Sequence, residues 1–443
     1  MLEPESRHAL LDNLRPPPGF VLDRAVGTTY SLDLMALLTA PLAFALFDRV
    51  RSDDSGLVID PIALLEAVRR HADRIDIFCQ AGQISPMREY RPIVTYLEQS
   101  IHAAVPRRET AIFHPKVWVL RFRDPESEER RYRLLCLSRN LTFDQSWDTA
   151  LVMDGSTGRP QDGNGPLSDF LRSLPALAVG EIPQDRVAAV RDLAQELAEV
   201  HFELPPGFHD MRYWPLGHDA VERWPFEGRI DRLLVISPFL TIGMTHRLRS
   251  KRRWDSLISR PETLDHLGSA ATEDYSEVLV LSPDANVVDA PAVDGADEAP
   301  DRDTAKSYLE GLHAKCFIAD AGRDARVWTG SANATDAAYG GNVEFLVELI
   351  GRRARVGIEA VMADQPGQPT LRSILEPYRP PNGEPMALTA DEEIERDLDA
   401  ARRRLGALVW TADAGVVEPD VFSLRLRAVP RDRQSLPADH GPV

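Results

Sequence analysis

The sequence predicts an α/β protein built from two similar halves of one chain, followed by a small C-terminal extension. Its 443 residues are too many for one ordinary hydrophobic core, so the length alone favours two or three domains. Strand-like apolar runs alternate with helical stretches, which is typical of an α/β sheet. One string of polar residues also occurs twice, at 114–148 and at 313–344. We therefore expect the two halves to share one architecture.

The first half is predicted to alternate strands with helices. The expected strands are short apolar runs, and they cover Val26–Leu32, Ile75–Gln80, Ile112–Phe122, Tyr132–Ser138 and Thr149–Met153. The expected helices are Leu34–Phe47, Pro61–His71 and Tyr90–Ala103. The charged segment Asp124–Arg130 is predicted to be a hairpin loop. The segment Gly155–Gly165, rich in Gly, Pro, Asp and Asn, then ends the first half as a loop.

The second half is predicted to repeat this order. Helices at Leu167–Leu174 and Gln184–His201 and a turn at Pro205–Gly207 are expected to lead into it. A helix is expected around Met244–Arg252. The expected strands are Leu233–Ser237, Glu277–Leu281, His313–Ala319, Ala325–Thr329 and Val343–Ile350.

The composition changes after Glu359. A proline-rich stretch covers Pro366–Pro385, and Thr389 with Glu392 forms a capping box for a helix that ends at Leu405. Two strands are expected at its end, Ala407–Thr411 and Val421–Val429, and the acidic segment Asp284–Arg302 is predicted to be a mobile insertion. The predicted domains are an N-terminal lobe at 1–165, a connecting helical segment at 166–225, a C-terminal lobe at 226–362, and a proline-rich linker with a small subdomain at 363–443.

Composition bounds the compartment and the partners. Cys79, Cys136 and Cys316 lie in apolar strand-like segments, and an odd number of buried thiols indicates a reducing cytoplasm. We find no uncharged apolar run that would span a bilayer and no signal-peptide pattern, so we expect a cytoplasmic protein without membrane contact. The net charge of −18 argues against broad attraction to phosphate polymers, although it does not describe a local cleft.

Basic residues cluster at two places, either as solvated surface or as a rim that neutralises a phosphate backbone. These residues are the run Arg247–Arg253 and, beside the first copy of the repeated string, Arg107, Arg108, Arg121 and Arg123.

Each copy of the repeated string places a histidine and a lysine two positions apart. The first copy has His114 and Lys116, followed by Ser138-Arg-Asn140-Leu-Thr142 and Asp148. The second copy has His313 and Lys315, followed by Ser331-Ala-Asn333-Ala-Thr335 and Glu344. Residues two apart on a strand point to the same face, so each imidazole and ammonium converge on one spot. Such a pair suits an anionic phosphorus centre.

Chance does not explain the repetition. The chain has 11 histidines and only four lysines among 51 basic residues, Lys116, Lys251, Lys306 and Lys315. Random placement would give about 0.1 His-x-Lys triplets, and the chain has two. Because a compact ammonium and a planar guanidinium are not interchangeable, lysine at both places indicates a chemical requirement.

These residues resemble the signature of the phospholipase D superfamily, which is His-x-Lys, four residues and Asp, followed by a Gly/Ser-Ser-x-Asn segment. The second copy fits in full, with Asp320 and Gly330-Ser331-Ala332-Asn333. The first copy has Arg121 where the aspartate is expected and Leu137 before its serine, and it is similar to the tyrosyl-DNA phosphodiesterases, which also lack that aspartate. The resemblance implies two phospholipase D-like lobes of mixed β-sheet flanked by helices, which form a pseudo-dimer around one site.

The resemblance also implies a covalent route. One histidine attacks phosphorus and the other protonates the leaving oxygen; by resemblance His114 attacks and His313 is the acid, although the residues themselves do not decide this. The two lysines, Asn140 and Asn333 would hold the nonbridging oxygens.

Carboxylates are expected to orient the two imidazoles. We expect Asp148 to orient His114 and Glu344 to orient His313, with Asp320 as a more distant support. Four hydroxyl side chains are expected either to donate to phosphate or to cap turns: Ser138, Thr142, Ser331 and Thr335.

Nucleic acid is the expected substrate, because basic residues flank both motifs and aromatic side chains that stack on bases lie nearby in sequence: Trp118, Phe143, Trp147, Trp254, Trp328 and Tyr339. The resemblance implies a nuclease of a bacterial defence or repair system that works beside a helicase or other ATPase. Two alternatives stay open, namely a phospholipase D or phosphatidyl transferase acting on lipid, and a noncatalytic nucleic-acid-binding module. No cofactor is expected, and the other histidines form no metal-ligand cluster with the cysteines.

Overall fold

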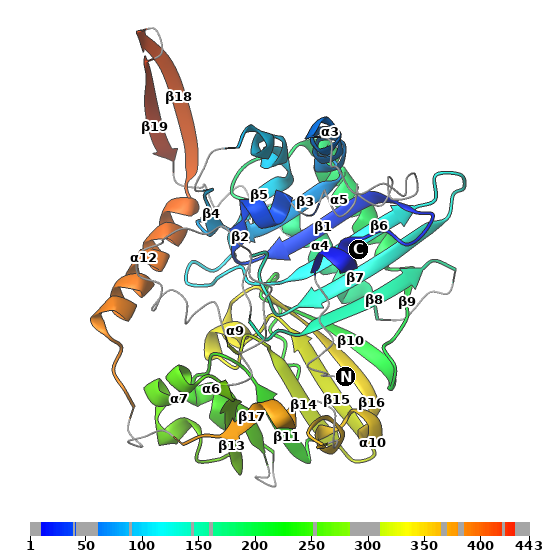
Figure 1. Ribbon diagram of the computed structural model, residues 1–443, viewed down its shortest axis with the longest axis vertical. Helices are drawn as coiled ribbons and strands as arrows, with labels where there is room; N and C mark the ends of the chain where they lie inside the picture. The colour runs from blue at the N-terminus through cyan, green and yellow to red at the C-terminus, as the bar shows by residue number, and fades with distance from the viewer. Residues whose placement is uncertain are drawn as a thin grey trace.

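The computed structural model describes residues 10–38, 40, 61–87, 91–142, 146–158, 163–250, 255–283, 311–364, 370–379, 385–418 and 421–429. Two mixed β-sheets flanked by helices form two lobes, drawn above and below one another in Figure 1. The predicted α/β class with two similar lobes is confirmed. The predicted insertion Asp284–Arg302 lies outside the described residues, as do most of the expected helix Leu34–Phe47 and part of the basic run Arg247–Arg253.

The first sheet has seven strands. Its spatial order is β5 (Ile101–Ala104), β3 (Ile75–Gln80), β1 (Val21–Thr29), β6 (Val117–Arg123), β7 (Arg130–Leu137), β8 (Ala150–Ser156) and β9 (His201–Phe202). The strands β1, β3 and β5 run parallel, and β6 to β9 are antiparallel to their neighbours. All six residues of β3 are buried, as is usual for a parallel strand covered on both faces.

The second sheet repeats this topology. Its order is β10 (Phe208–Leu216), β16 (Glu344–Arg352), β15 (Asp324–Gly330), β14 (Cys316–Ala321), β11 (Arg232–Ile236), β12 (Ser256–Ile258), β13 (Glu277–Leu281) and β17 (Leu375–Pro377). The strands β11, β12 and β13 are parallel, as β1, β3 and β5 are in the first sheet. The antiparallel set β14, β15 and β16 corresponds to β6, β7 and β8. The two halves therefore match strand by strand, and β17 is an additional edge strand of the second sheet.

One hydrophobic core joins the two sheets. It combines side chains of the first sheet, such as Val119 and Leu134, with side chains of the second, such as Phe345 and Val347. The apolar faces of α4 (Gly165–Leu177) and α5 (Gln184–Leu197) complete this core. A shared core fixes the lobes relative to one another, which is what a site built from both halves requires.

Smaller helices flank the two sheets. In the first lobe these are α1 (Leu10–Leu14), α3 (Pro61–Ala72) and the 3-10 helix η1 (Pro92–Ser100). In the second lobe they are α6 (Ile242–Arg247), α7 (Pro261–Leu267), α9 (Asp336–Gly340), α10 (Arg353–Val356), α11 (Ile358–Val361), η2 (Ser269–Ala271) and η4 (Arg372–Ile374). A further pair of two-residue strands, β2 (Leu32–Asp33) and β4 (Ile84–Ser85), lies beside the first sheet.

Two expectations about element type and position differ from the structure. The helix expected over Tyr90–Ala103 is the 3-10 helix η1 followed by the strand β5, because alternating burial at Ile101–Ala104 pairs this segment with β3. The segment expected at 166–225 to be a connection is divided between the lobes, since β9 extends the first sheet and β10 extends the second. The strand β17, from the expected C-terminal extension, also joins the second sheet.

The C-terminal extension forms a helix and a hairpin. The capping box of Thr389 and Glu392 is present and begins α12 (Ala390–Gly406), as the sequence predicts. This helix runs beside both lobes at the left of Figure 1. Glu392 at its start pairs with His266 of the second lobe (3.1 Å), and Asp399 further along accepts a hydrogen bond from Gln83 of the first lobe. The hairpin of β18 (Val409–Glu418) and β19 (Val421–Val429) follows.

Candidate active site

The two His-x-Lys segments meet at the boundary between the lobes. Each lies just before an antiparallel strand, β6 or β14, and each pairs with the acidic segment of the other half. The backbone N–H of His114 donates to the carbonyl of Val343 (2.9 Å), and the N–H of His313 donates to the carbonyl of Trp147 (2.8 Å). Both halves of the chain therefore contribute backbone as well as side chains to one site.

The histidine–carboxylate pairs cross between the halves. Nδ1 of His114 lies 3.0 Å from Oε2 of Glu344, and Nδ1 of His313 lies 2.9 Å from Oδ1 of Asp148. This corrects the expected pairing within each copy. The reason is the exchange of backbone segments, because Val343 and Trp147 precede the two acids and each is hydrogen-bonded to the opposite histidine segment. An ionised carboxylate only accepts hydrogen bonds, so Nδ1 of each ring carries the proton and Nε2 keeps its lone pair.

The two lysines are buried beneath the histidines. Nζ of Lys116 donates to the carbonyl of His114 (3.0 Å), and Nζ of Lys315 donates to the carbonyl of His313 (2.7 Å). The exposed fractions are 1% for Lys116 and 0% for Lys315. A buried ammonium is costly unless anions lie nearby, and here two buried carboxylates balance the two lysines. The site is therefore charge-neutral when both imidazoles are neutral.

Electrostatics tie all four side chains to one another. Burial lowers the pKa of His114 to about 4, opposed by Glu344 and assisted by both lysines. Burial and the charge of Lys315 lower the pKa of His313 to about 3, and Lys116 also contributes. Each imidazole thus lies within the field of both lysines, as a shared site requires.

The two carboxylates remain ionised in this setting. Burial acts to raise the pKa of Glu344, but the interaction with His114, the charge of Lys116 and the hydrogen bond from Ser331 outweigh it, so the pKa is lowered. Burial also acts to raise the pKa of Asp148. The interaction with His313, the charge of Lys315 and the hydrogen bond from Ser138 outweigh it, so this pKa is lowered as well.

Ser138 and Ser331 hold the carboxylates in place. Oγ of Ser138 donates to Oδ1 of Asp148 (2.8 Å), and Oγ of Ser331 donates to Oε2 of Glu344. The same two hydroxyls accept the backbone N–H groups of Thr149 (2.8 Å) and Phe345 (3.0 Å). Both serines have no exposed surface. Their expected role in binding substrate is corrected, because their donor and acceptor sites are engaged within the protein.

The remaining polar residues of the two segments behave differently. Oδ1 of Asn140 and Oδ1 of Asn333 are buried without a hydrogen-bond partner, at matching positions of the two halves. A buried amide acceptor with no protein partner is unusual, and it leaves both side chains available to a ligand. Thr335 is instead the N-cap of α9 and accepts from Ala338, while the carbonyl of Thr142 accepts from Arg139.

Asp320 and Arg121 occupy matching positions and both lie away from the imidazoles. Each stands five residues beyond its lysine on a strand, which is about 16 Å along the chain. Oδ1 of Asp320 accepts from the N–H of Ile358 at the start of α11 (3.1 Å). Arg121 bridges Asp23 (2.6 Å) and Glu196 (2.9 Å), so it is no part of a basic rim. The support expected from Asp320 is corrected to a local anchoring of α11.

Tyr30 is a site residue that the motifs did not indicate. Its ring centroid lies 5.3 Å from that of His114. Its hydroxyl is 3.3 Å from Oδ1 of Asp399 and accepts from Arg403 (3.3 Å), both on α12. Only the end of a buried strand marks this tyrosine in the sequence, and its partners lie about 370 residues away in the extension.

A basic groove lies between the first lobe and α12. It is a cavity of about 880 Å³, within the range of ligand sites, and four arginines with one glutamate contribute its charged lining: Arg107, Arg108, Arg403, Arg404 and Glu109. Gln80 also lines it, and Oε1 of Gln80 accepts from the N–H of Phe113, next to His114 (2.6 Å). Two residues of the groove lining thus contact neighbours of His114: Gln80 accepts from Phe113, and Arg403 donates to Tyr30.

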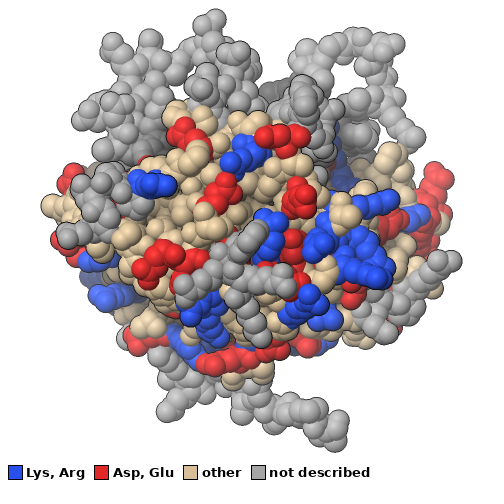
Figure 2. Space-filling view, turned by 90° about the horizontal axis from the view of Figure 1, so that it is seen from below, with Lys and Arg blue, Asp and Glu red and all other residues tan. Residues whose placement is uncertain are grey.

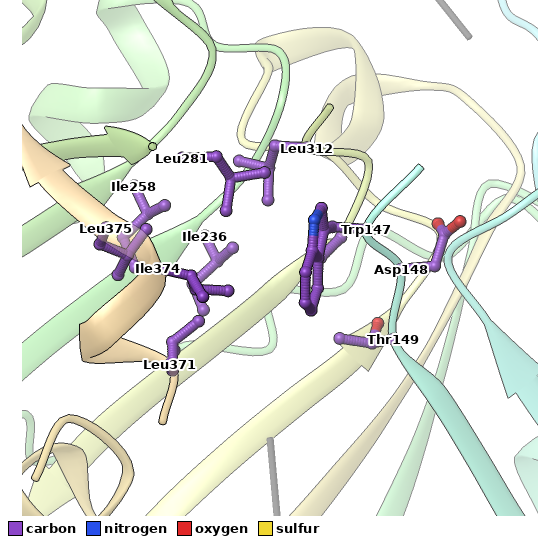
Figure 3. Close-up of a pocket in the computed structure, with 11 residues that line it drawn as sticks. Trp147, Asp148, Thr149, Ile236, Ile258, Leu281, Leu312, Leu371, Ile374 and Leu375 are labelled. Atoms are coloured by element: carbon purple, nitrogen blue, oxygen red, sulfur yellow. The ribbon is translucent and has the colours of Figure 1, made fainter. Parts of the chain in front are cut away.

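An apolar pocket adjoins the opposite carboxylate. Figure 3 shows Trp147 facing aliphatic side chains of the second lobe, including Ile236, Leu281 and Ile374, with Asp148 on the far side of the indole. The pocket measures about 80 Å³, about half of the cavity of roughly 150 Å³ that holds benzene, so it is too small for a nucleobase or an acyl chain.

The other aromatic residues divide between core and undescribed segments. Trp118 and Trp328 are buried core residues. Phe143 and Trp254 lie outside the described residues. The hydroxyl of Tyr339 is buried, and its ring packs on Trp224. Of the six candidates for base stacking, Trp147 alone lines a pocket at the site among the described residues.

Basic and acidic side chains are mixed on one face of the molecule. Figure 2 shows the molecule from below, where basic and acidic side chains are interspersed.

Within the described ranges, no helix is both long and apolar enough to cross a membrane. In the same part of the chain, no three His, Cys, Asp or Glu side chains are grouped to hold a metal ion.

Comparisons with known proteins find likeness in fold but not in sequence. No family model matches the chain, and no curated protein matches it. A mutant of the yeast tyrosyl-DNA phosphodiesterase aligns with 10% identity and a TM-score of 0.45, over 86% of this chain and 95% of that one. Phosphatidylserine synthase of Haemophilus influenzae aligns with 11% identity and a TM-score of 0.37, over 90% of both chains.

Polyphosphate kinase of Porphyromonas gingivalis aligns with 13% identity and a TM-score of 0.36, over 89% of this chain and 51% of that one. The three names carry three activities, so they select no substrate for this chain. The crossed histidine–carboxylate pairs at the junction of the lobes are therefore described from this chain's own contacts.

Proposed function

We propose that the protein is a phosphodiesterase that works without a metal ion and cleaves nucleic acid through a phosphohistidine intermediate. The observation that carries the proposal is the pair of crossed imidazole–carboxylate contacts above two buried lysines. Two neutral imidazoles with unprotonated Nε2 atoms offer a nucleophile and a proton carrier, and the lysines offer fixed positive charge.

The covalent step begins at His114. Nε2 of His114 attacks phosphorus, the bond from phosphorus to the leaving oxygen breaks, and protonated His313 gives its proton to that oxygen. His313 is then neutral and takes a proton from water, which attacks phosphorus and breaks the P–N bond. Products are a phosphomonoester and an alcohol, and both histidines return to their starting forms. Resemblance to the superfamily assigns the nucleophile to His114.

The negative charge of the substrate favours protonation of one histidine, which then serves as the general acid. Without substrate, pKa values of about 4 and about 3 leave both rings neutral at pH 7. A phosphodiester adds one negative charge to a site whose lysines and carboxylates already balance. That charge favours protonation of one imidazole, so binding of the correct anion creates the general acid. Glu344 and Asp148 stabilise whichever ring is positive, as the carboxylate does in a triad.

The basic groove favours nucleic acid over lipid. Arg107, Arg108, Arg403 and Arg404 line the basic groove, whose residues Gln80 and Arg403 contact neighbours of His114, in a protein with a net charge of −18. Such a local excess of arginine matches a phosphate backbone that continues beyond the cleaved bond. A lipid headgroup has one phosphodiester and gives such a channel no role.

A substrate panel tests the proposal. The protein is incubated in EDTA with single- and double-stranded DNA, RNA and phosphatidylcholine vesicles, beside His114→Ala and the control His209→Ala, a change of an exposed histidine. We expect cleavage of nucleic acid that persists in EDTA, is lost in His114→Ala and is kept in His209→Ala. Release of choline would favour the lipid alternative, and tight binding without turnover would favour the noncatalytic module. A helicase or ATPase partner stays a prediction.

A second experiment tests the groove. Arg404 is exposed on the last turn of α12, and Arg191 is exposed on α5 away from the groove. We expect Arg404→Glu to weaken nucleic-acid binding about tenfold or more at low salt and to reduce the salt dependence of binding. The matched charge change Arg191→Glu should leave both nearly unchanged. Equal losses in the two variants would refute a specific path for the strand.

A further inference from the structure

The C-terminal hairpin has one wholly apolar face. It projects from the upper left of Figure 1, and β18 and β19 pair only with each other among the described strands. Directly opposed residues share a face of an antiparallel ribbon. One face carries the pairs Trp410 with Ala428, Ala412 with Leu426, Ala414 with Leu424, and Val416 with Phe422. The other carries Thr411 with Arg427, Asp413 with Arg425, and Gly415 with Ser423.

This apolar face is open to solvent. The exposed fractions reach 73% for Val416, 68% for Phe422 and 65% for Leu424. An isolated two-stranded hairpin is at best marginally stable in water, and a contiguous exposed apolar patch marks an interaction surface. All eight positions on this face are apolar, and a ribbon with water on both faces would not require such a pattern. The face therefore has the pattern of a sheet that packs on another layer.

The shape of the face identifies the second layer. Every opposed pair on it joins one large side chain with a smaller one: Trp with Ala, Leu with Ala twice, and Phe with Val. A second hairpin rotated by 180° about an axis parallel to the strands lays β18 over β19 of the other copy. Each large side chain then meets a smaller one of the partner, which is how packed layers interdigitate. We propose that two copies of this chain associate through these apolar faces.

The geometry also sets the strength of the association. Strands of nine or ten residues at about 3.3 Å per residue give a ribbon about 30 Å long and about 10 Å wide, or about 300 Å² per partner. A stable interface buries about 800 Å² per partner. The dimer is therefore of the weak, transient class and should form only at high protein concentration. The interface is isologous, because the same face serves both copies.

Sedimentation of the full chain tests the proposal. We expect the weight-average mass to rise from monomer toward dimer between about 1 and 200 µM protein. Leu424→Lys places a charge in the apolar face and should leave only monomer over this range. Ser423→Lys makes the same change one residue earlier on the polar face and should dimerise as the unchanged chain does. Thermal unfolding of each variant checks that the lobes stay folded.

Mixing variants tests the register. Leu424 of one copy is placed over Ala414 of the other, so Leu424→Lys and Ala414→Asp should each be monomeric alone and should dimerise with each other when mixed. Ala428→Asp lies four positions from that row and should not restore association with Leu424→Lys.

Three results would overturn the inference. The first is a protein that stays monomeric at 200 µM. The second is a dimer that Ser423→Lys disrupts as strongly as Leu424→Lys, or that no mixture restores. The third is a monomer that floats with phosphatidylcholine vesicles through this face, which would assign the hairpin to a membrane surface instead.

Discussion

The imidazole of His114 and the carboxylate of Glu344 lie 3.0 Å apart although 230 positions separate them in the chain. Together with the pair of His313 and Asp148, this contact means that neither half holds a complete histidine–carboxylate unit. Each copy of the motif provides an imidazole and a lysine to one pair and a carboxylate to the other. The pseudo-dimer is therefore required by the orientation of the rings as well as by the need for two histidines.

The crossed pairing can be measured on the histidines directly. Glu344→Gln removes the charge beside His114, so the ring nitrogen resonances of His114 should move and those of His313 should stay nearly fixed. Asp148→Asn should have the reverse effect. Nitrogen-15 NMR of histidine-labelled protein reports both rings. If the ring nitrogen resonances of His313 moved in Glu344→Gln and those of His114 did not, the result would support pairing within each copy instead.

The same two substitutions should slow catalysis strongly. Loss of the orienting carboxylate permits the wrong tautomer, which costs up to about 10⁴ in kcat in a well-studied triad. We expect a fall of about 10² to 10⁴ in kcat for Glu344→Gln and for Asp148→Asn, with folding retained. Steady-state rates on a soluble phosphodiester measure this, and a loss smaller than tenfold in both variants would argue against triad-like roles.

Asp320→Ala should leave the chemistry almost unchanged. Its carboxylate accepts from the N–H of Ile358 and lies about 16 Å of extended chain beyond Lys315. Loss of such a helix-start contact costs about 1 kcal/mol of stability. We expect kcat within about threefold of the unchanged protein and a lowered midpoint in urea unfolding. A fall of 10² or more in kcat would show that this aspartate acts on the site.

Ser138→Ala and Ser331→Ala should act mainly on stability. Each hydroxyl serves both a carboxylate and a backbone N–H, so its removal leaves buried groups without partners. Such a loss costs about 1–3 kcal/mol per site. Urea unfolding should show this decrease for each variant, and Thr157→Ala, which removes the hydroxyl of an exposed residue, is the control. Unchanged unfolding in both serine variants would contradict the assigned contacts.

The pH dependence should separate the free protein from the complex. Since burial lowers the pKa values of the rings to about 4 and about 3, the free protein seldom carries the protonated acid at neutral pH. The bound phosphate raises the pKa of that acid. The basic limb of kcat should therefore lie at higher pH than the basic limb of kcat/KM. Coincident limbs would show that the substrate charge does not control protonation.

The lowered pKa values also predict acid lability. A histidine whose folded pKa lies below its unfolded value of about 6.5 binds fewer protons when folded, so stability falls as the pH drops through this range. Each such ring contributes a slope of up to about 1.4 kcal/mol per pH unit between the two pKa values. Urea unfolding from pH 7 to 4 should show the decrease, and His114→Asn should make it less steep. An equal slope in His114→Asn would contradict a buried neutral ring.

The sequence was sufficient for the repeated motif and for the two-lobed α/β fold, because both depend on local pattern. Rare lysines mark the two His-x-Lys segments, and strand periodicity places most of the sheet. Which acid meets which histidine depends on exchange of backbone segments between the halves, and no local pattern carries that information. The same holds for Tyr30 and Arg403, which meet across about 370 residues.

Other differences also depend on contacts between segments that are distant in the chain. The position of Asp320 fits the spacing of the motif. Spacing alone does not show which group its carboxylate contacts, and in the structure that group is the N–H of Ile358. The segment Ile101–Ala104 has too few residues to show strand periodicity, and its parallel pairing with β3 decides its conformation. Ser138 and Ser331 each donate one hydrogen bond and accept another, and the sequence does not show with which partners.

A burst measurement tests whether His114 forms the covalent intermediate and His313 is the general acid. The substrate is a p-nitrophenyl phosphodiester of thymidine, whose leaving group needs no proton, and the variant is His313→Asn in EDTA. We expect a rapid release of about one p-nitrophenolate per protein molecule, followed by stalled turnover, with the nucleotide bound to His114 in protein quenched with base. His114→Asn should give no burst. Release without any adduct on His114, or an undiminished burst in His114→Asn, would contradict the two-histidine mechanism.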